Sequence, residues 1–234
     1  MKNIAIITGA SSGIGLETAK LFLKQNYEVI NLSRSPCPEP QVKNIFLDLE
    51  HIETVKIVEQ IMPFLQKANL ICLIHNAALT LKDAVPTLEI KNLQKLLQIN
   101  VVACEILNQM IIPHMKKGSS ILYVGSTLST KAIAGSASYT ISKHALVGLM
   151  RATCQDLQNS FIHTACICPG PTRTPMLMDM IIENNAETLR HMESLSAENR
   201  LIEPIEIART LFFCAENSVI NGSIIHAHLG QKES

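Results

Sequence analysis

The chain has 234 residues, 47% of them hydrophobic, which is enough for one sizeable core and too little for two comfortable domains. Its 20 basic and 20 acidic residues give a net charge of zero, so it lacks the basic footprint that nucleic acids and anionic membranes attract. We expect a single domain over residues 1–234, with neither nucleic acid nor membrane as a partner.

The start of the chain does not resemble a targeting segment. Met1 is followed almost at once by "NIAIITGASSG", without the basic start, long apolar run and cleavage site of a signal peptide. No other window offers the about 18 uninterrupted apolar residues of a spanning helix. Seven cysteines are scattered without a C-x-x-C or metal-ligand spacing. We therefore expect a soluble, cytoplasmic protein without a metal site.

Short β-branched runs alternate along the chain with longer segments of helical periodicity. The runs occupy residues 3–8, 28–33, 44–47, 70–75, 120–125, 163–168 and 222–227. Near-continuous apolar strands separated by helices are typical of a parallel sheet covered on both faces, connected by right-handed crossovers. The predicted fold is a single α/β domain with a doubly wound parallel sheet of the Rossmann type.

A glycine-rich turn follows the first predicted strand. The sequence "TGASSGIG", residues 8–15, leads into an amphipathic helix. Glycines at such a turn let the backbone approach a diphosphate, whose charge the helix N-terminus attracts. The alternative is a tight turn that only packs the helix on the strand. Because of the flanking elements we expect a dinucleotide-binding loop made of Thr8, Gly9, Ser11, Ser12, Gly13, Ile14 and Gly15.

The end of the second predicted strand bears on which dinucleotide binds. The residue that reads the adenine ribose is expected about 20 positions after the glycine loop, which places it at Ser33, with Arg34 next. A serine does not repel a 2′-phosphate as an acidic residue would, and an arginine can bind that phosphate with two hydrogen bonds. The pair favours NADP(H) over NAD(H). The alternative is that Arg34 is a solvated loop charge.

The stretch "SASYTISKHA", residues 136–145, opens a long periodic segment that predicts a helix over residues 138–157. Tyr139 and Lys143 lie at i and i+4, on one face of this helix. The same spacing also arises by chance, so the alternative is an exposed tyrosine beside a solvated lysine. Ser126, thirteen residues before Tyr139, follows the fifth predicted strand at the edge where open α/β sheets bind ligands.

Together these motifs resemble the short-chain dehydrogenase/reductase family. The match consists of T-G-x-x-x-G-x-G at 8–15, a serine thirteen residues before Y-x-x-x-K, and P-G-x-x-x-T at 169–174, in the family's order. The resemblance implies an oxidoreductase that transfers a hydride between NADP(H) and a carbonyl or secondary alcohol. Within that activity, 3-oxoacyl thioesters are one candidate substrate class. The alternative function is a non-catalytic NADP(H)-binding regulatory or scaffold protein.

The resemblance also implies roles for single residues. Tyr139 would protonate the carbonyl oxygen, Ser126 would hold that oxygen, and Lys143 would bind the nicotinamide ribose and acidify Tyr139. Asn100 would hold a water molecule of a proton relay. Further cofactor contacts, around the adenine, its ribose and the nicotinamide, are implied for Asp48, Leu49, Asn76, Ala77, Pro169, Gly170, Thr172 and Thr174.

The sequence departs from the family's pattern at several positions. His75 and Ala78 stand where the family has the first asparagine and the glycine of N-N-A-G, and Thr172 replaces a valine or isoleucine. The usual V-D-G-G near the C-terminus is absent, which puts the last strand and its subunit contacts in doubt.

Two pairs of reactive side chains have a structural interpretation. His226 and His228 alternate on the last predicted strand, but two histidines make an incomplete metal site, so we expect packing. For Cys166 and Cys168 we expect packing in a buried strand rather than redox chemistry.

Residues 175–204 are expected to form a lid over the substrate. The methionines of this segment, with Leu177, Ile181 and Ile182, favour an apolar, adaptable wall, although methionines at helical spacing are also ordinary packing. The identity of the substrate stays open.

The predicted helix over 138–157 and the helical segment 92–115 are apolar on most sides. Such a helix is usually buried on most sides, and only one side can lie on its own sheet. In the family these two helices pair across a two-fold axis. We therefore expect a homodimer or, through a second interface, a homotetramer.

Overall fold

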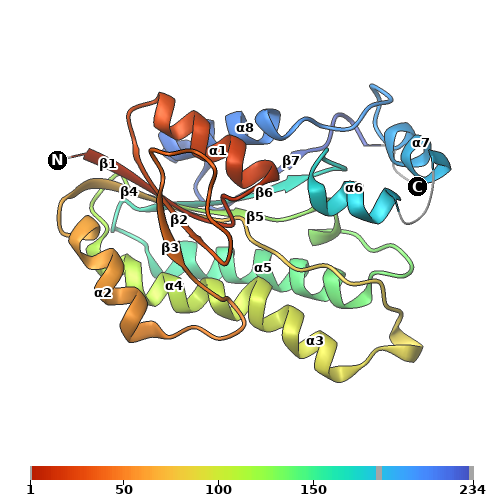
Figure 1. Ribbon diagram of the computed structural model, residues 1–234, viewed down its shortest axis with the longest axis horizontal. Coiled ribbons are helices and arrows are strands. Elements are labelled where there is room, and N and C mark those ends of the chain that lie inside the picture. The colour runs from red at the N-terminus through yellow and green to blue at the C-terminus, as the bar shows by residue number, and fades with distance from the viewer. Residues whose placement is uncertain (1, 183–185, 232–234) are drawn as a thin grey trace.

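The computed structural model describes residues 2–182 and 186–231. Its centre is one seven-stranded sheet (Figure 1). Every neighbouring pair of strands is parallel, and the strand order is β3-β2-β1-β4-β5-β6-β7. The predicted doubly wound parallel sheet is confirmed. The strands are β1 (Lys2–Thr8), β2 (Glu28–Ser33), β3 (Lys43–Phe46), β4 (Ala68–His75), β5 (Ser120–Val124), β6 (His163–Pro169) and β7 (Ser223–Ala227).

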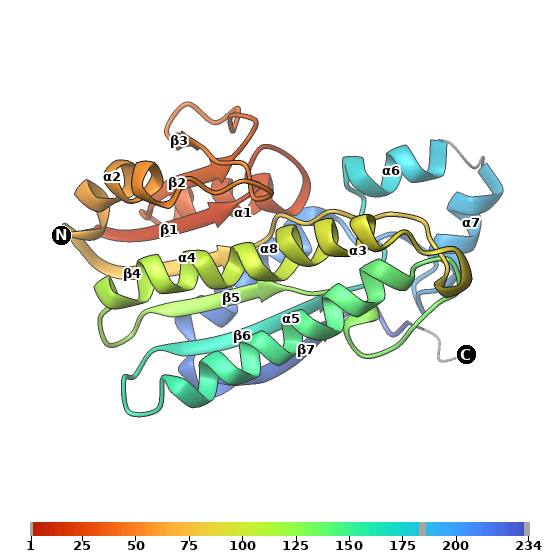
Figure 2. The same ribbon diagram turned by 90° about the horizontal axis from the view of Figure 1, so that it is seen from below.

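Helices cover both faces of the sheet, as Figures 1 and 2 show. One face carries α1 and α8, and the other carries α2, α4 and α5. Two further helices, α6 and α7, lie beyond the carboxyl ends of the strands. The bounds are α1 (Gly13–Lys24), α2 (Thr54–Leu65), α3 (Ile90–Leu97), α4 (Ala103–Ile111), α5 (Ala137–Asp156), α6 (Pro175–Ile182), α7 (Ala186–Ser194) and α8 (Pro204–Glu216).

The strands are apolar on both sides because each side packs into a separate core. In β1, Ile4 and Ile6 join the core beneath α2, α4 and α5, whereas Ala5 and Ile7 join the core beneath α1 and α8. Burying an isoleucine side chain stabilises the fold by about 1.5–3 kcal/mol. Two-sided burial therefore explains why runs without polar alternation form central strands.

Cys166 and Cys168 are fully buried on β6, in the core that faces α5, and their sulfur atoms lie 3.9 Å apart. This placement confirms the predicted packing in a buried strand. The two thiols share a hydrogen bond in which either sulfur can donate, and this contact lowers the pKa of Cys168 and raises that of Cys166. All seven cysteines are free thiols.

The predicted helical segment 92–115 has an irregularity that its periodicity does not reveal. Between α3 and α4 lies a π-helical segment, Gln98–Val102, and the Ala103 amide donates to the Gln98 carbonyl five residues earlier. By length and composition the stretch Ile90–His114 could also cross a membrane. In this fold its apolar residues Leu96, Leu107 and Ile111 are core residues. Segments of π-helix often mark functional sites, and Asn100 lies in this one.

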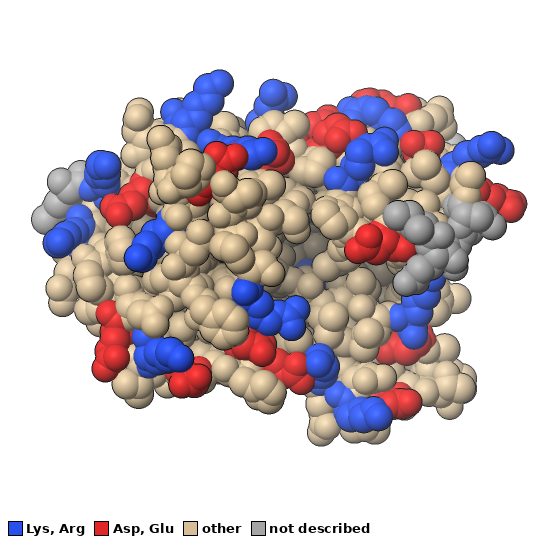
Figure 3. Space-filling model, viewed as in Figure 1, with Lys and Arg blue, Asp and Glu red and all other residues tan. Residues whose placement is uncertain are grey.

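The charged side chains follow the balanced composition. On the face drawn in Figure 3, lysines and arginines alternate with aspartates and glutamates, and neither sign forms a continuous field. This part of the surface therefore offers no large electrostatic target for a polyanion.

Candidate dinucleotide and catalytic site

Three positions of the loop between β1 and α1 require glycine. Gly9 and Gly13 have φ angles of 72° and 54°, in the left-handed region that disfavours other residues. A Cβ atom on Gly15 would lie 2.2 Å from the Gly9 carbonyl oxygen and 2.6 Å from Asn76 Nδ2. The loop therefore keeps the start of α1 close against the end of β1, as a diphosphate cradle requires.

The residues directly after β4 form hydrogen bonds with the glycine loop. They do so between β1 and β4, where the strand order reverses. The Thr8 hydroxyl accepts hydrogen bonds from the backbone amides of Asn76 and Ala77, each at 3.0 Å. Asn76 Nδ2 in turn donates to the carbonyls of Thr8 at 3.0 Å and Gly9 at 3.1 Å. Four of the predicted cofactor residues thus meet at the topological switch point between β1 and β4, where open α/β sheets bind ligands.

Asn31 supports the same loop from outside the motifs of the sequence. Its side chain is fully buried on β2, where Oδ1 accepts from the Ala10 amide at 2.9 Å. Nδ2 donates to Asn44 Oδ1 at 2.9 Å and to the Ser35 carbonyl at 3.1 Å. The only indication in the sequence is a lone amide inside the apolar run "EVINLS".

The residues predicted to surround the adenine ribose lie at the carboxyl ends of β2 and β3. Ser33 ends β2 and its hydroxyl accepts from the Ser35 amide at 3.3 Å, while the Arg34 side chain is exposed. Asp48 follows β3 and accepts from the Glu50 amide at 3.0 Å. The Leu49 carbonyl accepts from a glutamine side chain of the π-helical segment. Ser12 is the N-cap of α1, and its side chain makes no capping bond.

Tyr139 and Lys143 lie side by side at the start of α5. The Lys143 ammonium nitrogen is 5.5 Å from the centroid of the Tyr139 ring and donates to the Val124 carbonyl at 2.8 Å. Only 2% of Lys143 is exposed. A lysine is rarely buried to this extent without a defined partner, and here the end of β5 supplies one. The predicted i, i+4 juxtaposition is therefore present.

Ser126 follows β5, two residues after Val124, whose carbonyl binds Lys143. It is the N-cap of a short 3₁₀-helix, Thr127–Ser129, that packs against α5. Its hydroxyl accepts from the Leu128 amide at 3.1 Å, and its own amide donates to the Ser129 hydroxyl at 3.1 Å. The serine hydroxyl keeps its hydrogen for another acceptor, because both of these bonds use other atoms of the serine.

The Asn100 side chain is buried, and both its oxygen and its nitrogen are hydrogen-bonded to other residues. Oδ1 accepts from the Leu79 amide at 2.8 Å, and Nδ2 donates to the Leu79 carbonyl at 2.9 Å and to the Ser142 hydroxyl at 3.0 Å. Both donor hydrogens of the side chain are thus in use. The side chain thus joins the segment after β4 to α5. Oδ1 keeps a second acceptor position, so the water-binding role that the resemblance implies for Asn100 stays a prediction.

Asp83 is a second residue of the site that lies outside the motifs of the sequence. Its carboxylate accepts from the Ser138 amide at 2.9 Å and, through a short hydrogen bond, from the Ser138 hydroxyl. Ser138 immediately precedes Tyr139. The two partners are 55 residues apart in the chain, so no local pattern marks Asp83.

His75, which departs from the family's pattern, points into the core. Nε2 lies 2.9 Å from Asn108 Oδ1, and the ring stacks on Tyr123 with centroids 4.9 Å apart. Burial lowers the pKa of His75 to about 4, so the ring is neutral and donates from Nε2. At the position where the family has an asparagine, this chain thus has a histidine that packs against Tyr123 and makes one buried hydrogen bond.

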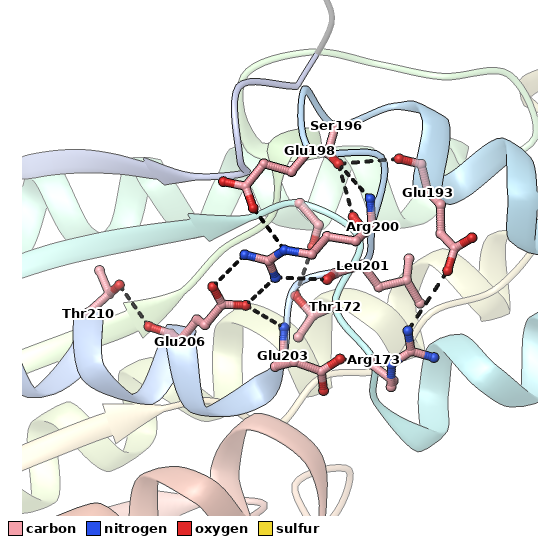
Figure 4. A network of polar contacts seen from close by, with 11 residues as sticks. Thr172, Arg173, Glu193, Ser196, Glu198, Arg200, Leu201, Glu203, Glu206 and Thr210 are labelled. Carbon is pink, nitrogen blue, oxygen red and sulfur yellow. Dashed lines mark hydrogen bonds and ion pairs between the residues drawn. The ribbon is translucent and has the colours of Figure 1, made fainter.

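Figure 4 shows ion pairs and hydrogen bonds that connect the predicted lid to the residues on either side of it. Arg173, in the loop after β6, donates to Glu203 at 2.9 Å and lies 3.8 Å from Glu193 at the end of α7. Arg200 binds Glu206 with two hydrogen bonds, at 2.6 and 2.9 Å, and thereby lowers the pKa of that carboxyl to about 2. Residues 183–185 of the lid lie outside the described residues.

The loop that contains Pro169, Gly170, Thr172 and Thr174 lies between the glycine loop and the last strand. A Cβ on Gly13 would lie 3.0 Å from Thr174 Cγ2, and one on Gly170 would lie 3.0 Å from His228 Cβ. His228 Nδ1 accepts from the Gln231 amide at 2.9 Å. Within the described part of the chain, no group of three or more histidine, cysteine or acidic side chains is arranged to hold a metal.

Comparison with known proteins places this geometry in one family. Residues 3–185 match the family model described as short chain dehydrogenase. A 3-beta-hydroxysteroid dehydrogenase of Comamonas testosteroni is 29% identical over 96% of the chain and 93% of its own length. A 3-oxoacyl-(acyl-carrier-protein) reductase of Thermotoga maritima is 25% identical over 95% and 94%. A solved short chain dehydrogenase family protein from Francisella tularensis superposes with a TM-score of 0.90, at 25% identity over 98% of both chains.

Proposed function

The chain belongs to the short-chain dehydrogenase family, and on that premise we propose that it is an NADP(H)-dependent oxidoreductase acting on a carbonyl or secondary alcohol. The observation that carries the proposal is the buried Lys143 ammonium, which lies 5.5 Å from the centroid of the Tyr139 ring and binds the last carbonyl of the strand that Ser126 follows. An ammonium so placed can stabilise the negative charge that develops on the phenol while its proton is transferred.

A dinucleotide fits the residues that are present. The left-handed Gly9 and Gly13 and the crowded Gly15 form a cradle that a Cβ atom would fill, at the N-terminus of α1. Thr8, Gly9, Ser11, Ser12, Gly13, Ile14 and Gly15 would hold the diphosphate. Ser33, Arg34, Asp48, Leu49, Asn76 and Ala77 would surround the adenosine half. Lys143 and the loop with Pro169, Gly170, Thr172 and Thr174 would hold the nicotinamide half.

Each side chain of the catalytic group has one task. When bound, the nicotinamide supplies or accepts the hydride. Ser126 donates a hydrogen bond to the carbonyl oxygen of the substrate, which fixes the carbonyl and polarises it. Tyr139 donates its phenolic proton to that oxygen during reduction and takes it back during oxidation. Lys143 stabilises the negative charge that forms on the phenol oxygen, and Asn100 keeps α5 joined to the segment after β4.

NADP(H) is preferred because the end of β2 carries Ser33 and the exposed Arg34. No acidic side chain stands there to repel a 2′-phosphate, and a guanidinium can bind the phosphate through two hydrogen bonds. The compartment is the reducing cytoplasm, which the seven free thiols support. These two assignments rest on residue chemistry rather than on the relatives.

The substrate is a small molecule with a ketone or secondary alcohol beside an apolar body. Within the lid, Ile181 is buried and Met176 is 45% exposed, so the segment offers apolar surface at the carboxyl edge of the sheet. Two of the relatives are named for reactions at a 3-oxo or 3-hydroxy position. A 3-oxoacyl thioester is therefore one class to test first.

The test is a panel of ketones, aldehydes and 3-oxoacyl thioesters, monitored by the loss of NADPH absorbance, with Tyr139→Phe protein as the control. We expect turnover by wild type and not by the variant. If wild type binds NADPH and turns over none of the panel, the alternative of a cofactor-binding regulatory or scaffold protein replaces this proposal.

A further inference from the structure

The first turn of α5 is capped from outside the helix. The N-cap residue, Ser136, makes no side-chain capping bond. Asp83 takes its place: the carboxylate accepts from the amide and the hydroxyl of Ser138, and the Asp83 carbonyl accepts from the Ala137 amide at 3.2 Å. The Asp83 amide also donates to the Gly135 carbonyl at 3.1 Å. A single residue thus binds the start of α5 through four hydrogen bonds.

The chemistry of this cap suits its position. The first amides of a helix have no partner within the helix, and the macrodipole favours a negative charge beside them. Ser138 is 0% exposed, so loss of the carboxylate would leave a buried amide and a buried hydroxyl without acceptors. A first turn without its cap frays, and Tyr139 is the third residue of this turn.

Asp83 is itself tied to the rest of the site. Four residues earlier, both backbone groups of Leu79 are bonded by the Asn100 side chain. Asn100 also bonds the Ser142 hydroxyl, which donates to the Tyr139 carbonyl at 2.9 Å. The backbone that carries Tyr139 is therefore held on one side by Asp83 and on the other by Asn100.

We propose that Asp83 is a positioning residue that sets the place of the Tyr139 phenol by capping α5 from the segment after β4. The proposal rests on the function proposed above, because it assigns Asp83 a share in proton transfer without contact with the substrate. Lys143 lies one turn further on and has its own bond to the Val124 carbonyl. Loss of Asp83 should therefore lower kcat and leave cofactor affinity largely intact.

The experiment compares Asp83→Ala and Asp83→Asn with Asp156→Ala, which removes a carboxylate at the opposite end of the same helix. The readouts are kcat with the best substrate of the panel, NADPH affinity by fluorescence titration, and hydrogen exchange of the amides of residues 137–140. Asp83→Ala should lose at least about tenfold in kcat, since small displacements of a catalytic group are costly, while NADPH affinity stays within about twofold. The amides of residues 137–140 should exchange hydrogen faster in Asp83→Ala than in Asp156→Ala.

Asp83→Asn is the conservative rescue. Its Oδ1 can still accept from the Ser138 amide and its Nδ2 can donate to the Ser138 hydroxyl, so kcat should stay within about threefold of wild type. If Asp83→Ala does not fold, Ser138→Ala supplies the test, because it removes only the hydroxyl bond. That variant should lose severalfold in kcat at unchanged NADPH affinity.

The proposal is overturned if Asp83→Ala, or Ser138→Ala in its place, keeps the kcat of wild type, or if Asp83→Asn falls as far as Asp83→Ala. Tyr139→Phe separates this failure from failure of the proposed function. If Tyr139→Phe is inactive and the Asp83 variants are unaffected, only the role of Asp83 is wrong. If Tyr139→Phe is fully active, the assignment of the catalytic group is wrong.

Discussion

Asn31, Asn76 and Asn100 each hold a backbone segment of the site, and each does so from a position that local sequence patterns describe only in part. Leaving a buried amide unbonded costs about 1–3 kcal/mol, so each of these side chains fixes the segment that it bonds. Asn76 and Asn100 are predictable because they lie in motifs with a family spacing. Asn31 and Asp83 are not, because they lie in none of these motifs and their partners are 21 and 55 residues away in the chain.

The cofactor preference is a prediction about two residues. NADPH should bind wild type at least about tenfold more tightly than NADH, since charge-assisted hydrogen bonds contribute about 1.5–3 kcal/mol. In the Ser33→Asp, Arg34→Leu double variant the order should reverse, because an acidic residue repels the 2′-phosphate and bonds the free ribose. Calorimetric titration of both proteins with both cofactors measures this. Equal affinities of the wild-type protein for NADPH and NADH would rule out the preference for NADP(H).

His75 should make the free energy of unfolding depend on pH. The unfolded chain binds a proton near the ordinary histidine pKa of about 6.5, whereas the folded chain binds it near pH 4. Between these values the unfolded state holds more protons, so stability is complete above about pH 6.5 and falls by about 1.4 kcal/mol per pH unit toward pH 4.

The matched variant for this prediction is His75→Gln, which can donate to Asn108 but does not titrate. Urea unfolding at pH 7 and pH 5 should give a larger loss of stability for wild type than for the variant. The burial argument would be contradicted by identical losses in the two proteins.

Among the elements, the strands and the helix of the catalytic pair are the most predictable parts. β-branched apolar runs gave all seven strands, and the expected helix over 138–157 corresponds to α5, Ala137–Asp156. The π-helical segment Gln98–Val102 could not be predicted, because a change from i+4 to i+5 bonding leaves the apolar periodicity almost unchanged. The fastening of the lid by Arg173 and Arg200 depends on tertiary ion pairs, which spacing does not reveal.

The turn between β5 and Ser126 should not accept a larger residue. A Cβ on Gly125 would lie 2.8 Å from both Cys166 Sγ and Ser129 Oγ and 2.9 Å from Cys168 Sγ. Gly125→Ala should therefore lower the free energy of unfolding by about 1–3 kcal/mol, the usual cost of overpacking. The displaced Ser126 should also lower kcat.

Gly148→Ala is the control for this substitution. A Cβ there meets no atom within 4 Å, and the residue lies inside α5, so the variant should gain about 0.5–1 kcal/mol. Thermal unfolding and kcat of both variants test the prediction. A destabilised Gly148→Ala protein or an unaffected Gly125→Ala protein would contradict it.

The single α/β domain follows from the length of the chain and the order of its elements, whereas association with a second copy depends on the exposed surface. Part of the apolar content of α5 is covered within the chain, since Leu146, Val147 and Met150 are core residues. What stays outside is a narrower face that includes Ile141, 42% exposed. Val102, which lies between α3 and α4, is 43% exposed.

We predict that these faces of α4 and α5 pair across a two-fold axis to give a homodimer, with a homotetramer as the alternative if β7 forms a second contact. A small residue such as Ala152 would let the helices approach closely. Light scattering at micromolar concentration should give at least twice the monomer mass, and Ala152→Arg should reduce it to the monomer. A stable, active wild-type monomer would mean that no partner is needed.

Tyr139→Phe tests the proposal that Tyr139 is the proton donor of a nicotinamide-dependent carbonyl reductase. The measurement is kcat with the best substrate of the panel, together with NADPH affinity. The variant should bind NADPH within a few-fold of wild type, and its kcat should fall by at least about a hundredfold, the usual effect of losing a general acid. A variant that turns over at nearly the wild-type rate would contradict the claim, because another group would then supply the proton.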